Sequence, residues 1–191
     1  MKRSLAGVCV VLLLCQGCAS AFRKDATACR THLLKGQHYF ASTKTYDKAV
    51  NEFTMALDIG RRINMSRLPM VMLGETYVRG NEIGKARKVS DEALKKWPKE
   101  SSVWELTGKV DLKQNRLETA EDSFKRALKL AKDKGDKKRI ASLISLTMGL
   151  RSYAQANMQS TKKHFLEVKD MMLAKDMKPK AKKILGVNLS K

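Results

Sequence analysis

A 34-residue period in the middle of the sequence is the feature that most constrains the fold. Residues in the segment 67–100 recur, as the same or a similar type, 34 places later in the segment 101–134. Each copy has the spacing of two short helices joined by a turn, with a Gly on the first helix expected to face an Ala on the second. The sequence therefore predicts two consecutive helical hairpins. The repeating positions are Met70 and Trp104, Gly74 and Gly108, Ala86 and Ala120, Ser90 and Phe124, and Ala93 and Ala127, with turns at Asn81-Glu82 and Asn115-Arg116.

This pattern resembles the tetratricopeptide repeat family. That family places a large apolar and a small residue on the first helix, then small residues, an aromatic and a proline on and after the second. The first copy departs from the pattern at Ser90, where an aromatic is usual, and the second copy departs at Thr107, Asp111 and Lys132. The residues that the resemblance implies for packing are Gly74, Ala86, Ala93, Pro98, Trp104, Gly108, Ala120, Phe124 and Ala127.

Two weaker copies extend the array at both ends. A first repeat over 30–63 is visible mainly in its second half, and Gly36 is expected to replace its small residue. A fourth repeat fits 142–175, where the first helix is expected to start early and to be capped by Asp136. With the repeats near 67–100 and 101–134, these segments make up a predicted solenoid.

The basic segment 176–191 is interpreted as a cap on the last hairpin. Pro179 opens a short apolar-sided helix there, and such a helix commonly covers the exposed end of a solenoid. A free basic tail is the alternative. The resemblance thus implies an all-α, right-handed superhelical solenoid of about four hairpins over 30–175, with a C-terminal capping helix.

The N-terminus has the features of an export signal. A basic start is followed by an apolar run of about ten residues over 5–14, which is too short to span a bilayer of about 30 Å. The sequence that follows resembles a bacterial lipobox, which implies a lipoprotein signal peptide over 1–17, lipidation of Cys18 and a tether over 18–29. The alternatives are cleavage at Cys15, an ordinary signal peptide cut near Ala19 or Ala21, and an uncleaved anchor.

Charge and export together define the expected partners. The chain carries 39 Lys and Arg against 19 Asp and Glu, a net charge of +20 that attracts anionic partners. Because an exported protein does not meet nucleic acid, none is expected as a ligand. Anionic lipid, lipopolysaccharide, cell-wall material or an acidic protein remain as candidates.

Catalysis has little support in the sequence. The three histidines, at 32, 38 and 164, lack the H-E-x-x-H spacing, and neither a nucleophile elbow nor a phosphate-binding loop is present. After signal removal and lipidation, Cys29 is the remaining free thiol, so no internal disulfide is expected. We expect no catalytic residue, no metal and no cofactor.

The inner wall of the predicted solenoid is the expected binding site. The family resemblance places the first helix of each repeat on this wall, where side chains are free to contact a peptide or protein segment. The expected groove residues are Val71, Glu75, Arg79, Glu105, Lys109, Leu112, Lys113 and Tyr153.

These features together predict a lipid-anchored periplasmic adaptor in a bacterial envelope, on the outer membrane. The combination of a lipobox and a solenoid resembles small lipoproteins that assist type IV pilus and secretin assembly. A cell-wall-associated scaffold that recruits peptidoglycan enzymes is the alternative.

Overall fold

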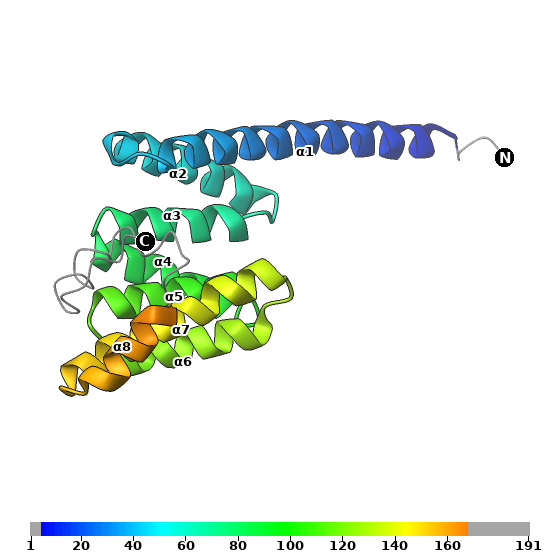
Figure 1. The fold of residues 1–191 in the computed structure, drawn as a ribbon. Coiled ribbons are helices and arrows are strands. Elements are labelled where there is room, and N and C mark those ends of the chain that lie inside the picture. The colour runs from blue at the N-terminus through cyan, green and yellow to red at the C-terminus, as the bar shows by residue number, and fades with distance from the viewer. Residues whose placement is uncertain (1–4, 168–191) are drawn as a thin grey trace. The chain divides into compact units, whose positions relative to one another are not determined.

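The structure is a computed structural model that describes the backbone of residues 5–167, all of it helical or in short connections (Figure 1). Its eight α-helices pack as sequential antiparallel pairs, so the predicted all-α class is confirmed, and the arrangement is consistent with a helical repeat array. The helices are α1 (Leu5–Phe40), α2 (Tyr46–Arg62), α3 (Arg67–Arg79), α4 (Ile83–Lys96), α5 (Ser101–Lys113), α6 (Leu117–Leu130), α7 (Lys134–Ala154) and α8 (Met158–Glu167), with a short 3-10 turn η1 (Thr43–Thr45).

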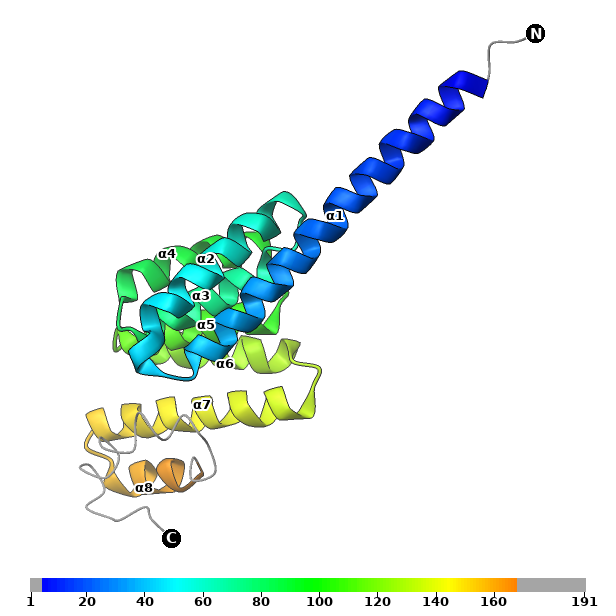
Figure 2. The ribbon, with the colours of Figure 1, turned by 90° about the horizontal axis from the view of Figure 1, so that it is seen from above.

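The chain divides into two compact units, Met1–Glu82 and Ile83–Lys191. In the first unit, α1 packs along α2, and α2 contacts α3 (Figure 2). In the second unit, α4 contacts α5, α5 pairs with α6, α6 contacts α7, and α7 pairs with α8. Within each unit, every helix therefore packs against its neighbours in sequence.

Three helix pairs, α1·α2, α5·α6 and α7·α8, share one type of crossing. A Cβ atom built on Gly36 of α1 would lie 2.5 Å from the ring of Phe53, and one on Gly108 of α5 would lie 2.6 Å from the ring of Phe124. Gly149 of α7 meets the ring of Phe165 in the same way, at 3.0 Å. The expected role of Gly36 is confirmed. The nearest side chain to Gly108 is the aromatic ring of Phe124 and not, as expected, an alanine, because ring atoms occupy the place where a Cβ would project.

The connections between helices repeat as well. Asn81 and Asn115 follow α3 and α5 with φ of 61° and 59°, in the left-handed region that Asn tolerates. The amide of the next residue donates to a carbonyl five residues earlier: Glu82 to Tyr77 and Arg116 to Asp111, each at 2.9 Å. This is a Schellman motif, and both predicted turns are confirmed. The same motif follows α2 and α7, where Asn64 and Ala156 have φ of 59° and 57°.

The first helix extends through the segment expected to be a tether. Residues 18–29 belong to α1, which is continuous over Leu5–Phe40. This segment has no Gly or Pro and several alanines, so nothing in it interrupts a helix. No helix in the described part of the chain meets the criteria of length and hydropathy for a membrane span.

The first helix of the last described pair also starts earlier than the repeat predicts. The helix α7 begins at Lys134, and its N-cap is Asp133, whose carboxylate accepts hydrogen bonds from the amides of Gly135 and Asp136 at 2.7 and 3.1 Å. The expectation that Asp136 caps this helix is therefore wrong. The predicted capping helix over 176–191 lies outside the described residues.

Candidate functional site

Most of the residues predicted for packing lie in the interior, whereas Pro98 is exposed. Ala86, Ala93, Ala120, Phe124 and Ala127 are fully buried. The indole of Trp104 is half-buried against the cluster of Ala120, Phe124 and Ala127, and its Nε1 donates to the carbonyl of Pro98 at 2.7 Å. These positions therefore hold the helices together, as the sequence predicts, and Gly74 and Gly108 are buried as well.

The groove residues expected on α3 differ in exposure. Val71 is buried, Glu75 is half-buried and Arg79 is exposed. The Arg79 guanidinium lies 4.9 Å from the ring centre of Phe40 and donates hydrogen bonds to the carbonyls of Phe40 and Ala41. Arg79 therefore connects the end of α3 to the end of α1. Part of its hydrogen-bonding capacity is already used inside the protein.

A small pocket lies beside Arg79 in the first unit, with a volume of about 200 Å³. The hydroxyl of Tyr46 donates to the carboxylate of Glu82 at 2.5 Å. Burial, together with the hydrogen bond to Glu82, raises the pKa of Tyr46, so the phenol stays protonated. The Thr76 hydroxyl donates to a backbone carbonyl at 2.7 Å. The residues lining the pocket are Phe40, Ser42, Tyr46, Ala49, Thr76, Arg79 and Gly80.

On α5, the groove residue Glu105 is buried and bound within the protein. Its carboxylate accepts two hydrogen bonds from Arg139 of α7, at 3.0 and 2.8 Å, and lies 2.9 Å from the Lys109 ammonium. Burial by itself would raise the pKa of Glu105, but the hydrogen bonds and charges of Arg139 and Lys109 outweigh it and hold the pKa below its ordinary value. Glu105 and Arg139 thus connect α5 to α7.

The remaining groove residues in the second unit differ in access. Leu112 is half-buried and packs against the cluster around Phe124. Lys113, in the last turn of α5, and Tyr153, on α7, are exposed. Tyr153 shares one helical face with Arg139 and Leu146, because they are spaced by seven residues. Lys113 and Tyr153 are the predicted groove residues of this unit that solvent reaches most.

Two further buried carboxylates have an arginine from a neighbouring helix as partner. Asp111 of α5 binds Arg87 of α4, which also donates to the Gln114 side chain at 2.7 Å. Glu121 of α6 lies 2.8 Å from Arg151 of α7 as an ion pair. Each of these pairs connects consecutive helices. Sequence reasoning did not find them.

Another buried polar contact explains two departures from the repeat pattern. The hydroxyls of Ser90 on α4 and Thr107 on α5 lie 2.9 Å apart, and both residues are buried. Thr107 donates its own proton to the carbonyl of Val103, so Ser90 is the donor to Thr107. The signal in the sequence was that Ser90, Thr107 and Asp111 all depart from the pattern on adjacent helices.

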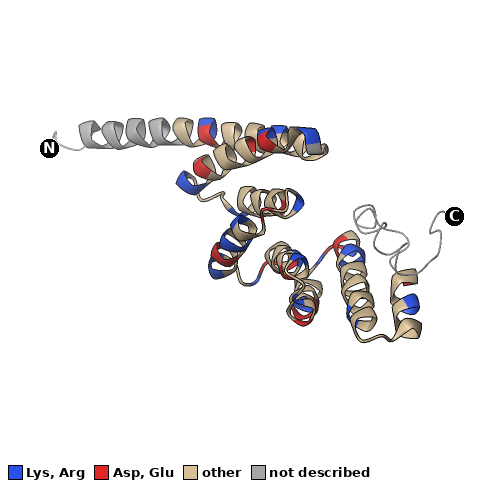
Figure 3. Cartoon of the chain, turned by 90° about the vertical axis from the view of Figure 1, so that its left-hand side faces the viewer, with Lys and Arg blue, Asp and Glu red and all other residues tan. Residues whose placement is uncertain are grey.

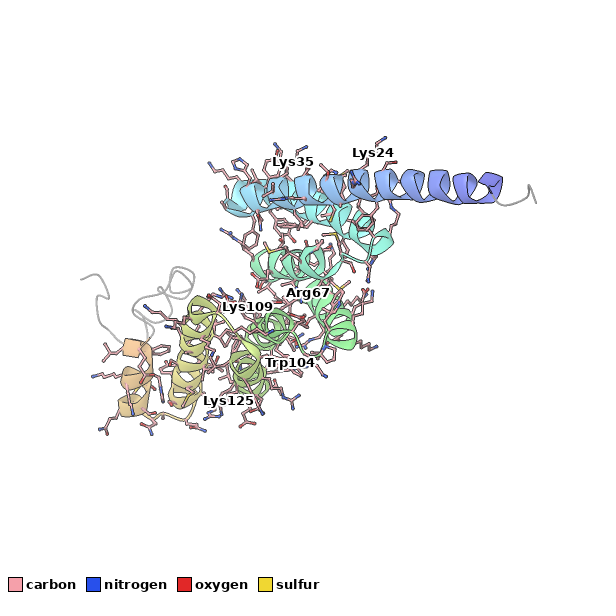
Figure 4. All side chains as sticks on the ribbon, turned by 90° about the vertical axis from the view of Figure 1, so that its right-hand side faces the viewer. Lys24, Lys35, Arg67, Trp104, Lys109 and Lys125 are labelled. Atoms are coloured by element: carbon pink, nitrogen blue, oxygen red, sulfur yellow. The ribbon has the colours of Figure 1, made fainter. Side chains whose placement is uncertain are left out.

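The described part of α1 carries a basic outer face. Lys24, Thr27, Thr31 and Lys35 follow one another at helical spacing, and all are exposed. Figure 4 shows Lys24 and Lys35 on the side of α1 that points away from α2. The basic residues of α1 and of the other described helices are blue in Figure 3.

Groups with catalytic or metal-binding potential are engaged in packing. The Cys29 thiol is buried against the carbonyl of Ala56 at 3.3 Å, and burial raises its pKa, which keeps it in the unreactive form. His32 Nδ1 lies 2.7 Å from the Glu52 carboxylate on α2. Within the described residues, no cluster of three or more His, Cys, Asp or Glu is arranged to hold a metal ion. Cys18 lies on α1, and its lipidation stays a prediction.

Comparison with protein families, with characterised proteins and with solved structures gives no match.

Proposed function

We propose that this chain is a non-catalytic adaptor of the bacterial envelope, built from tetratricopeptide-type hairpins and held to the membrane by a lipid on Cys18. The observation that supports the repeat most strongly is the recurrence of one crossing and one turn. Gly36, Gly108 and Gly149 each lie against a buried phenylalanine ring of the following helix. A Schellman turn follows α2, α3, α5 and α7. A unit of structure that recurs in this way is typical of solenoids, whose common use is protein binding.

The proposed ligand is a peptide or protein segment that contacts the first helices of the repeats. In the second unit, Glu105 is bound by Arg139 and by the half-buried Lys109, so the exposed Lys113 is the predicted wall cation that solvent reaches most. Tyr153 adds an exposed aromatic surface on the next first helix. A cation and an aromatic ring favour a segment with an acidic and an apolar side chain.

The envelope location rests on the sequence at the N-terminus. An adaptor with a lipid anchor and no catalytic centre fits a role in assembling a pilus or a secretin, in which a pore-forming subunit is held at the outer membrane. The alternative role, recruitment of peptidoglycan enzymes, differs in the partner and not in the structure of the adaptor.

The partner is tested by cross-linking and pull-down of the detergent-solubilised protein from envelope fractions. Secretin or pilus subunits are expected with the wild type, and recovery should fall with Lys113→Glu. The matched control is Lys129→Glu, since Lys129 is also an exposed lysine in the last turn of its helix, α6. Equal recovery with both variants would contradict the proposal that the partner binds this wall. Recovery of hydrolases or synthases would favour the alternative role.

The anchor is tested separately by mass spectrometry of the protein extracted from membranes. The expected N-terminal residue is Cys18 carrying diacylglycerol. An unmodified cysteine, or a start at Ala19 or beyond, would contradict the lipoprotein assignment.

A further inference from the structure

The two faces of α1 differ in charge and in what they contact. The inner face includes Cys29 and Gly36, which are buried against α2. The outer face, defined as Lys24, Thr27, Thr31, Leu34 and Lys35 with Arg23 and Arg30 at its edges, is exposed throughout. Within the first unit, α1 packs mainly against α2 and the short turn η1, and the Arg79 side chain of α3 contacts its C-terminal end at Phe40. The outer face is therefore a free surface of that unit.

All charged side chains of this outer face are cationic. The only acidic residue between 20 and 40 is Asp25, which is half-buried and lies 3.4 Å from Arg62 of α2. Among the described residues, no ion pair joins an acidic side chain to Arg23, Lys24, Arg30 or Lys35. Four uncompensated cations along one side of a single helix attract an anionic surface.

The geometry fits an extended anionic surface better than a single anion. Lys24 and Lys35 are eleven residues apart, which is roughly 16 Å along the helix axis. The hollow between them, about 500 Å³, is open and is bordered by long flexible cations and by threonines. The hydroxyls of Thr27 and Thr31 already donate to backbone carbonyls at 2.9 Å. Since none of the polar side chains that line the hollow is fully buried, it does not enclose one phosphate group.

An apolar side chain within the outer face is a second indication that this face contacts a membrane. Leu34 is 58% exposed and lies beside Lys35. At a membrane interface, basic side chains contact phosphates while neighbouring apolar side chains enter the boundary with the acyl chains. The proposed lipid site, Cys18, precedes Lys24 by six residues, or roughly 9 Å of helix. An anchored chain would hold the outer face close to the headgroups.

We propose that the outer face of α1 lies against anionic phospholipid headgroups of the membrane that holds the lipid anchor. The inference rests on the proposed anchoring at Cys18 and adds an orientation: α1 lies on the membrane surface, with α2 on its far side. Each lysine near an anionic surface contributes about 1 kcal/mol at low salt, so two of them shift the equilibrium roughly tenfold or more.

The test uses the lipidated full chain in vesicles of phosphatidylcholine alone or with phosphatidylglycerol. A fluorophore on Thr31→Cys reports on the outer face, because the buried Cys29 thiol does not compete for the label. The same label on Thr119→Cys, exposed on α6, is the control position. Acrylamide is the quencher because it is uncharged. We expect the label at residue 31, and not at 119, to be protected only in vesicles with phosphatidylglycerol. Protection should be lost in 0.5 M salt, because the Debye length falls from about 10 Å at 0.1 M to roughly 4 Å and the exposed charges are then screened.

The charge requirement is tested with Lys24→Glu combined with Lys35→Glu. The equilibrium constant between α1 lying on the membrane and α1 free of it should fall roughly tenfold or more. Protection of the label at residue 31 should fall with it. The control, Lys88→Glu combined with Lys129→Glu, changes the net charge equally on exposed lysines of the second unit and should retain protection. Equal loss in both variants would overturn the proposal, since it would mean that only total charge matters.

Further measurements distinguish phospholipid from other anions. They also distinguish the proposed orientation of α1 from the proposed lipid anchor. Inorganic phosphate without vesicles should give no protection; protection there, or protection only with lipopolysaccharide or an acidic polypeptide, would overturn the phospholipid assignment. Protein that remains in vesicles with residue 31 equally accessible in both lipids would contradict the orientation and leave the anchor intact. Protein that enters neither type of vesicle and lacks the lipid mass would contradict the anchor itself.

Discussion

The pairs α1·α2 and α5·α6 use the same crossing but different surroundings. In both pairs a glycine lies against a buried ring, Phe53 in one and Phe124 in the other. The polar contact between α1 and α2, from His32 to Glu52, is partly exposed, whereas Glu105 of α5 is buried beneath Arg139 of α7. The comparison teaches that the repeat sets how two helices cross, while buried charge pairs join a hairpin to the next helix.

The crossing itself is tested by removing each ring. Phe53→Ala and Phe124→Ala should each lower the free energy of unfolding by about 3–5 kcal/mol, because both rings are fully buried and each leaves a cavity beside a glycine. The measurement is urea unfolding followed by circular dichroism. Met55→Ala, at an exposed position on α2, should change it by less than about 0.5 kcal/mol. A small loss for one ring alone would show that the two crossings are not equivalent.

The difference between the buried charge pair of Glu105 and the more exposed contact of Glu52 is tested by replacing each carboxylate with an amide. Glu105→Gln should lower the free energy of unfolding by about 2–3 kcal/mol, since it weakens the hydrogen bonds from Arg139 and removes the ion pair with Lys109. Glu52→Gln, at the more exposed contact, should cost less than about 1 kcal/mol. Glu118→Gln is the exposed control. Equal costs at positions 52 and 105 would end the distinction between the two pairs.

Acid should reduce the contribution of Glu105 to the free energy of unfolding. The pKa of Glu105 is lowered in the folded protein, so its stabilising effect is present above the unfolded pKa of about 4.3 and is lost as the pH falls through the lower folded value. The difference in unfolding free energy between the wild type and Glu105→Gln should therefore shrink below about pH 4.3. Chemical denaturation at pH 7, 5, 4 and 3 measures it, and a difference that stays constant to pH 3 would contradict the lowered pKa.

The turns give the smallest expected effect. Ala156 adopts the left-handed conformation that Asn64, Asn81 and Asn115 adopt in the other turns, and it lacks their tolerance for it. Ala156→Gly should raise the free energy of unfolding by about 1 kcal/mol. The matched change Asn115→Gly should alter it by only a few tenths of a kcal/mol. A destabilised Ala156→Gly variant would mean that this turn differs from the others in solution.

The crossings and turns could be predicted because they depend on spacing within one hairpin. Gly108 and Phe124 are sixteen residues apart in a repeat that can be aligned by eye, and Asn115 sits between them. The charge pairs could not be predicted in this way. Arg87 and Asp111, or Ser90 and Thr107, belong to different hairpins, and their contact depends on how one helix is rotated against the next.

Glu105 shows what the tertiary structure decided. The sequence determined that the middle of the chain forms helical hairpins, that glycines mark their crossings, and that Glu105 falls on a first helix. The sequence also indicated that the first helix of the fourth repeat starts before 142, with a cap at Asp136. Only the fold revealed that α7 starts at Lys134, capped by Asp133, and that Arg139 lies over Glu105. Helical periodicity is local and is encoded by neighbouring residues. Whether a charge is buried or free for a ligand depends on which distant helix covers it.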